Sequence, residues 1–170
     1  LERSAQHHRL DPEAIFRAVA GVHRRCRGAY AIVAMIAGYG MLAFRDPYGI
    51  RPLVIGVAEA PAGPEYMVAS ESVALEACGF RVLRDVDPGE AIYVDFAGTM
   101  HARQCAESPR LVPCIFEFVY LARPDSVIDG TSVYESRIHM GAALARRISA
   151  MPEAQDVDVV IPIPDSSRPS

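Results

Sequence analysis

Residues 45–53 have the sequence RDPYGIRPL and lie between two stretches of β pattern. The proline and the glycine of this segment favour a tight turn, in which Asp46 can accept hydrogen bonds from backbone amides. Arg45 and Arg51 would then form ion pairs at the surface. Taken alone, the segment predicts a structural turn between strands.

A helix and a β-hairpin are predicted before this turn. Residues 11–13 read Asp-Pro-Glu, which supplies an N-cap residue, a proline for the first helical position and an acid favoured by the helix dipole. We expect this helix to end near residues 24–28. Residues 29–36 and 41–44 are rich in β-forming side chains and are joined by a glycine turn, which predicts a hairpin.

More strands and one short helix are predicted after the turn. The strands are expected at residues 53–57, 66–69, 81–85 and 91–96. The helix is expected at residues 73–78, with Ser70 or Ser72 as its N-cap and Gly79 in the left-handed position at its C-terminal end. This density of strands, with helices before and among them, indicates a layered α+β domain.

The last third of the chain has a different pattern. Residues 114–122 form an apolar run between two loops, and a long helix is predicted at residues 133–150. Residues 158–164 (DVVIPIP) then predict a buried strand that leads into a loop at Asp165. A helix followed by a buried strand and a polar loop is half of an α/β unit.

Composition excludes several classes of protein. Of the 170 residues 51% are hydrophobic, which indicates a globular protein, and the apolar runs are too short or too rich in glycine to cross a membrane. The net charge is -4 and the arginines are scattered, so no nucleic-acid partner is expected. The N-terminus has neither an initiator Met nor the pattern of a secretory signal, so we expect an internal fragment of a longer protein.

The four cysteines lie far apart, without any C-x-x-C pair. This spacing argues against a zinc ribbon, and a disulfide framework is not expected in so apolar a chain. A reducing cytoplasm is the expected location.

Two motifs resemble a known enzyme family. The turn at residues 45–53 resembles the R-D-P-x-G-I-R-P-L turn of glutamine amidotransferase domains with an N-terminal cysteine nucleophile, which occur in amidophosphoribosyltransferases and asparagine synthetases. Residues 116–126 (FEFVYLARPDS) resemble the F-E-x-V-Y-F-A-R-P-D-S stretch of amidophosphoribosyltransferases, for which asparagine synthetases have no counterpart. The resemblance to amidophosphoribosyltransferases runs from about residue 11 to residue 167, in the same order, and favours that family.

The resemblance implies a fold of class α+β in two parts. Residues 1–110 would be the latter part of an N-terminal-nucleophile glutaminase domain, an αββα sandwich. Residues 111–170 would be a linker and the start of an α/β type I phosphoribosyltransferase domain.

The resemblance also implies a reaction, that of a glycosyltransferase with glutamine amidotransferase activity. In this family an N-terminal cysteine releases ammonia from glutamine through a thioester, and the ammonia displaces pyrophosphate from phosphoribosyl pyrophosphate to give 5-phosphoribosylamine. This is the first committed step of purine synthesis. The nucleophile would precede Leu1, so no residue here is assigned a catalytic role and the fragment alone is expected to be inactive. Purine nucleotide inhibitors and a homotetramer are implied as well.

Phe116 and Tyr120 match family positions that line the passage through which ammonia travels. Their four-residue spacing could place both side chains on one face of a helical turn. The passage must be apolar and closed to water, because protonation would remove the nucleophilic lone pair of ammonia. Ordinary packing of aromatic side chains in a core is the alternative.

Ser166 is the candidate metal-site residue, because Ser or Thr at this family position is associated with Mg²⁺ and phosphoribosyl pyrophosphate. The alternative is that Asp165 or Ser166 caps a helix. Cys114 matches one ligand of the iron-sulfur cluster that some members carry, but no cluster is expected here and a buried free thiol is preferred. The five histidines are interpreted as surface or structural residues.

A noncatalytic remnant of the family, acting as a partner or a nucleotide sensor, is the alternative function.

Overall fold

The computed structural model describes residues 10–154, 156–164 and 167–168. The chain forms two compact units, Leu1–Pro113 and Cys114–Ser170.

The first helix of the N-terminal unit, α1 (Pro12–Arg25), begins where the sequence predicts. Asp11 is its N-cap residue, and the Asp11 side chain accepts a hydrogen bond from the backbone N–H of Glu13 at 3.0 Å. The last turn carries His23, Arg24 and Arg25, where positive charge suits the helix dipole.

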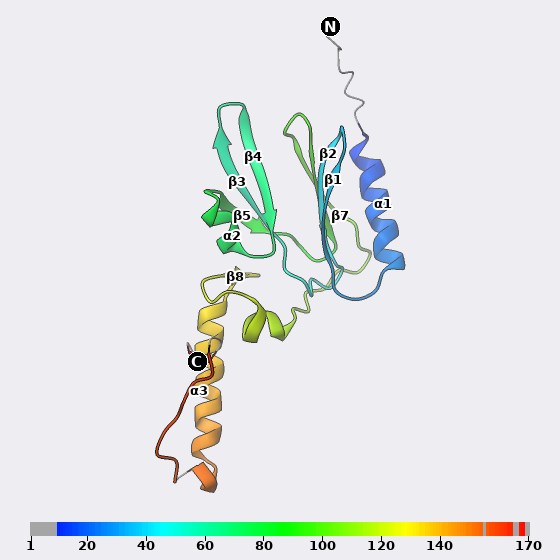
Figure 1. The fold of residues 1–170 in the computed structure, drawn as a ribbon. Helices are drawn as coiled ribbons and strands as arrows, with labels where there is room; N and C mark the ends of the chain where they lie inside the picture. The colour runs from blue at the N-terminus through cyan, green and yellow to red at the C-terminus, as the bar shows by residue number, and fades with distance from the viewer. Residues whose placement is uncertain (1–9, 155, 165–166, 169–170) are drawn as a thin grey trace. The chain divides into compact units, whose positions relative to one another are not determined.

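Four antiparallel strands form the first sheet, in the order β1-β2-β6-β7. They are β1 (Ala31–Ile36), β2 (Gly40–Arg45), β6 (Glu90–Asp95) and β7 (Met100–Gln104). The predicted hairpin is confirmed as β1 and β2, whereas β7 was not predicted. Figure 1 shows α1 beside this sheet, and the core between them contains Ile15, Phe16, Val19, Phe44, Ala91 and Tyr93.

Three antiparallel strands form the second sheet, in the order β4-β3-β5. They are β3 (Val54–Ala60), β4 (Gly63–Ala69) and β5 (Arg81–Asp85). A second core, composed of Ala43, Leu53, Ile55, Val86 and Ile92, takes residues from both sheets. The unit is therefore layered, with a helix outside two sheets that share a core.

The short helix α2 (Ser72–Ala77) packs beside the second sheet. The residue at its N-cap position is Glu71, and no side chain makes a capping hydrogen bond there. The prediction that Ser70 or Ser72 caps this helix is therefore wrong, because Glu71 already has the extended backbone of an N-cap and Ser72 lies inside the helix. Gly79 has φ of 81°, as the predicted left-handed position requires.

The C-terminal unit contains one long helix and a few short elements. They are the π-helical turn η1 (Glu117–Leu121), the strands β8 (Val127–Ile128) and β9 (Thr131–Ser132), the helix α3 (Val133–Ser149) and the 3₁₀ turn η2 (Pro152–Ala154). The predicted long helix is confirmed as α3, and the Ser132 side chain caps it by accepting a hydrogen bond from the N–H of Glu135 at 3.2 Å. The core of the C-terminal unit is small and consists of Ala122, Ile128 and Val133, with Phe118 packed against them.

The predicted buried strand at residues 158–164 is not found. These residues have no regular secondary structure, and Val160 and Ile161 are 87% and 79% exposed. A buried strand needs paired strands beside it, and none of the strands in the described part of the chain pairs with this segment.

No helix among the described residues is long and apolar enough to cross a membrane.

Candidate functional site

The turn at residues 45–53 is built around the buried carboxylate of Asp46. Its Oδ1 accepts hydrogen bonds from the backbone N–H groups of Tyr48 at 2.9 Å and Ile50 at 3.2 Å. Its Oδ2 accepts from those of Arg51 at 3.1 Å and Tyr30 at 3.3 Å. The predicted role of Asp46 in holding the turn is confirmed.

Arg45 differs from the prediction, because its side chain is 1% exposed and does not lie on the surface. Its guanidinium donates to the carbonyl oxygens of Arg51 at 2.7 Å, Val86 at 2.8 Å and Gly49 at 2.8 Å. A buried guanidinium is stable only when its N–H groups find acceptors, and these carbonyls supply them. Because Val86 follows β5, this arginine ties the turn to the second sheet.

Gly49 is required in this turn for two reasons. Its φ of 57° lies in the left-handed region, where a side chain causes strain. An added Cβ would also lie 2.9 Å from Cγ of Pro88 and 3.0 Å from Cδ1 of Leu111. The glycine of the RDPYGIRPL motif therefore serves the packing of the turn.

His23 connects the end of α1 to the first sheet. Its Nδ1 lies 2.8 Å from the hydroxyl of Tyr30, and its Nε2 lies 3.2 Å from the carbonyl oxygen of Gly89. Because the carbonyl can only accept, the proton belongs on Nε2 and Nδ1 accepts from Tyr30. Burial lowers the pKa of His23, against the opposing hydrogen bond to Gly89 and the charge of Asp46.

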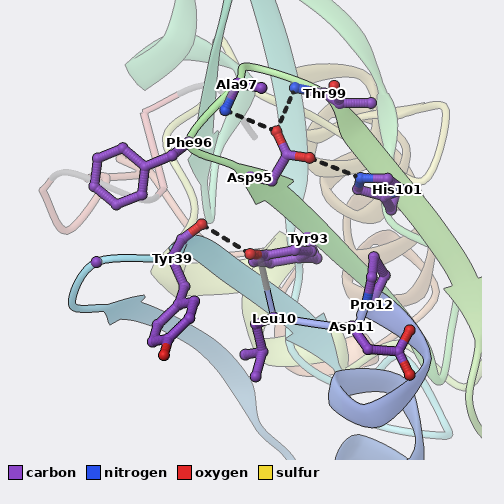
Figure 2. A pocket seen from close by; sticks show the side chains of 11 residues that line it. Leu10, Asp11, Pro12, Tyr39, Tyr93, Asp95, Phe96, Ala97, Thr99 and His101 are labelled. Carbon is purple, nitrogen blue, oxygen red and sulfur yellow. Dashed lines mark hydrogen bonds and ion pairs between the residues drawn. The ribbon is translucent and has the colours of Figure 1, made fainter. Parts of the chain in front are cut away.

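A pocket of about 740 Å³ lies between the start of α1, the β1–β2 turn and the β6–β7 hairpin. Figure 2 shows the carboxylate of Asp95 at the tip of that hairpin, where it accepts from the N–H groups of Ala97 and Thr99, both at 2.9 Å. Nε2 of His101 lies 3.2 Å from Oδ2 of Asp95. Hydrogen bonding to Thr99, His101 and Ala97 lowers the pKa of Asp95, the bond to Thr99 most.

One wall of the pocket is aromatic. The Tyr93 hydroxyl donates to the carbonyl oxygen of Tyr39 at 2.8 Å, and the Tyr93 ring stacks on that of His101 with centroids 5.9 Å apart. The hydrogen bond joins the two hairpins that border the pocket, and the ring contact lies within the β6–β7 hairpin. Sequence reasoning missed this group, because Tyr39 and Tyr93 lie 54 residues apart along the chain.

The two predicted passage residues lie in the C-terminal unit, at the π-helical turn η1. Phe116 is the N-cap residue of this turn and Tyr120 lies within it. Their side chains are 64% and 69% exposed on the unit, so they are not part of its small core. The structure therefore does not favour ordinary core packing for either ring within this unit.

Ser166 and the pair His7 and His8 fall outside the described residues. The thiol of Cys114 is free and partly exposed, whereas a buried thiol was predicted. Among the described residues, no three His, Cys, Asp or Glu side chains are grouped so that they could hold a metal ion.

Comparisons with known proteins agree with the sequence motifs. No protein-family model matches the chain. Curated relatives include the amidophosphoribosyltransferase of Pasteurella multocida, 57% identical over 162 residues, and that of Escherichia coli, 56% identical over 163 residues. Each match covers 95% of this chain and 32% of the relative.

Over nearly its whole length, this chain is similar in sequence to amidophosphoribosyltransferases.

Solved structures of the family have the same fold. The glutamine phosphoribosylpyrophosphate amidotransferase of B. subtilis, complexed with ADP and GMP, matches with a TM-score of 0.74 and 35% identity. That match covers 88% of this chain and 30% of the other. A structure described as the allosteric regulatory enzyme of purine biosynthesis matches with a TM-score of 0.75. The predicted mixture of α and β structure is thereby confirmed.

The chain spans about a third of the length of the amidophosphoribosyltransferases that it matches. The similarity extends over nearly the whole of this chain, including the turn around Asp46 and the η1 segment.

Proposed function

We propose that this chain is part of an enzyme that transfers glutamine-derived ammonia to phosphoribosyl pyrophosphate. The products are 5-phosphoribosylamine, glutamate and pyrophosphate, and the reaction is the first committed step of purine synthesis. The observation that carries the proposal is the high identity to amidophosphoribosyltransferases over 95% of the chain. Both reaction centres would be completed by parts of the enzyme outside this chain.

We assign the N-terminal unit to the glutaminase half of the enzyme. The two sheets with a common core and α1 on an outer face support this assignment, because an N-terminal-nucleophile domain is an αββα sandwich. The cysteine nucleophile would be supplied by the part of the enzyme that precedes this chain.

We assign the C-terminal unit to the start of the phosphoribosyltransferase half. A long helix after a short hairpin supports this assignment, and the following apolar segment at residues 158–164 would join the sheet of the complete domain. Its Val160 and Ile161 side chains are exposed, as expected for residues whose packing partners belong to the rest of the domain.

Phe116 and Tyr120 are proposed to line the passage for ammonia between the two centres. Both rings are largely exposed on their own unit, so they are available to form a wall with other parts of the enzyme. An aromatic wall excludes water, which limits the protonation of ammonia and keeps its nitrogen lone pair reactive.

Mg²⁺ is proposed as the metal of the phosphoribosyltransferase centre, with Ser166 as its one contact in this chain. Because the described residues form no metal-binding group, the other contacts would come from elsewhere in the enzyme. Purine nucleotides are proposed as inhibitors, in line with the ADP and GMP bound to the B. subtilis enzyme, and a homotetramer is proposed as the assembly.

The proposal is tested with the complete protein in an assay for pyrophosphate release. We expect release only when glutamine and phosphoribosyl pyrophosphate are both present. If the folded protein releases no pyrophosphate with both substrates, the enzyme proposal is wrong and a noncatalytic role replaces it.

A further inference from the structure

Arg137 is a buried cation in the C-terminal unit that has no assigned role. It lies on α3, and only 4% of the residue is exposed. Its Nε donates a hydrogen bond to the carbonyl oxygen of Phe118 at 2.8 Å, and its Nη2 donates to that of Ala122 at 2.8 Å. One guanidinium therefore binds two backbone carbonyls of the preceding segment.

The two carbonyls belong to η1 and to its C-cap, since Phe118 is the second of the five residues of this single turn and Ala122 is its C-cap residue. Carbonyl groups in the last turn of a helix have no further helical N–H to accept from and need other donors. The planar fork of an arginine can supply two donors with one side chain. Arg137 thus completes the hydrogen bonding of η1 from outside.

The η1 turn depends on such support because it is a single π-helical turn. Isolated short helices are unstable in water, and π-helical turns are rare and occur frequently at functional sites. Within η1, the N–H of Ala122 donates to the carbonyl of Glu117 at 2.9 Å. Ala122 belongs to the small core and Phe118 packs against it, so apolar contacts hold the segment as well.

The same turn presents the two exposed aromatic rings. Phe118 lies in the chain between Phe116 and Tyr120, and its own ring packs toward the core while the other two are exposed. Arg137 binds the backbone carbonyl of Phe118, at the centre of this alternation. A rotation of the turn would move these carbonyls relative to the guanidinium and disfavour the two arginine hydrogen bonds.

We propose that Arg137 is a positioning residue for Phe116 and Tyr120, which it holds in place by binding the carbonyls of Phe118 and Ala122. The inference rests on the proposed function, in which these two rings line the passage for ammonia. Arg137 touches no substrate in this role. It links α3 of the phosphoribosyltransferase half to the wall of the passage.

The test uses the complete protein with Arg137→Ala, Arg137→Lys and, as the matched control, Arg146→Ala. Arg146 is an exposed arginine in the last turn of the same helix. Three rates are measured for each protein: glutamate release, glutamine-dependent formation of phosphoribosylamine, and its formation from added ammonium salt.

Arg137→Ala is expected to lower the yield of phosphoribosylamine per glutamate released by roughly tenfold, because small displacements of reacting groups have effects of this order. Glutamate release and ammonia-dependent synthesis are expected to remain near wild type. Lysine keeps the charge but lacks the planar fork that binds both carbonyls, so Arg137→Lys is expected to recover part of the yield. Arg146→Ala is expected to match wild type.

A wild-type yield in Arg137→Ala would overturn the inference. An equal fall of all three rates in both Arg137 variants would also overturn it, since that pattern indicates a general structural role. If the wild-type protein itself makes no phosphoribosylamine from glutamine, the proposed function fails independently of Arg137.

Discussion

Arg84 of β5 and Glu90 of β6 form a two-armed ion pair that joins the two sheets of the N-terminal unit. The distances are 2.7 Å from Nη1 to Oε2 and 2.6 Å from Nη2 to Oε1. Glu90 is 7% exposed and also accepts from the backbone N–H of Asp87 at 2.9 Å. The hydrogen bonds to Glu90 raise the pKa of Arg84. The carboxylate therefore organises the β5–β6 turn as well as the contact between sheets.

Glu90→Gln is expected to destabilise the protein by about 1 to 2 kcal/mol, because the charged two-armed contact is lost while the shape is kept. The thermal unfolding midpoint measures the effect. Arg123→Ala serves as the control, since Arg123 pairs with Asp125 at a site where both side chains are more than half exposed, and little change is expected there. Equal midpoints for the two variants would contradict the role given to Glu90.

Gly40→Ala is expected to cost at least about 3 kcal/mol, because an added Cβ would collide with the carbonyl oxygen of Val94 in the neighbouring strand. Backbone atoms of a central sheet cannot move aside easily. Gly38→Ala is the matched control: Gly38 has φ of 83° but open space around it, so only backbone strain of about 1 kcal/mol is expected. Chemical denaturation measures the free energy of unfolding of both variants. A similar loss of stability in the two would show that the neighbouring strand moves aside and relieves the collision.

His23 is expected to make the stability of α1 depend on pH. Its pKa is lowered by burial, so the folded state binds this proton less readily than the unfolded state. The contribution of neutral His23 to folding stability is complete above pH 6.5, the ordinary pKa of histidine. It is lost as the pH falls through the pKa of His23 in the folded state.

The variant His23→Gln keeps one donor and one acceptor but does not titrate in this range. The protection factors of the α1 amides, which compare the exchange rates with the intrinsic rates at the same pH, are expected to fall less between about pH 7 and about pH 5 in this variant than in wild type. His139→Gln, at an exposed position on α3, should behave as wild type. An identical pH response in wild type and His23→Gln would exclude His23 as the source.

Tyr120→Ala in the complete protein is expected to leave glutamine hydrolysis intact and to lower the yield of phosphoribosylamine per glutamate, because the passage would admit water. Tyr134→Ala is the control, since Tyr134 is an exposed tyrosine of the same unit, 51% exposed against 69% for Tyr120. The measurement is the ratio of phosphoribosylamine formed to glutamate released, determined for each variant. An unchanged ratio for Tyr120→Ala would remove this residue from the passage.

Local sequence signals predicted those elements that local chemistry determines. The Asp-Pro-Glu start predicted α1, and the glycine turn predicted the β1–β2 hairpin. The Asp129-Gly130 pair, with φ of 49° and 72°, could have predicted the β8–β9 hairpin, because such pairs favour its turn. It was overlooked within a predicted loop.

Features that depend on distant parts of the chain could not be predicted in this way. β7 reads MHARQ, without the alternation of apolar residues that marks a strand, because it lies at an edge of the sheet. The burial of Arg45 depends on the carbonyl of Val86, 41 residues away. Phe116 and Tyr120 came from family resemblance alone, and nothing local to Arg137 indicates that it binds carbonyls 15 and 19 residues earlier.

Internal transfer of nitrogen is the central claim, and isotope labelling tests it most directly. The complete protein is supplied with phosphoribosyl pyrophosphate, glutamine labelled with ¹⁵N in its side-chain amide, and unlabelled ammonium salt at a concentration that supports little synthesis without glutamine. We predict that the phosphoribosylamine formed from glutamine keeps the label nearly undiluted, because the ammonia does not mix with the solvent. Product with the isotope content of the bulk ammonium, or no product at all, would contradict the account.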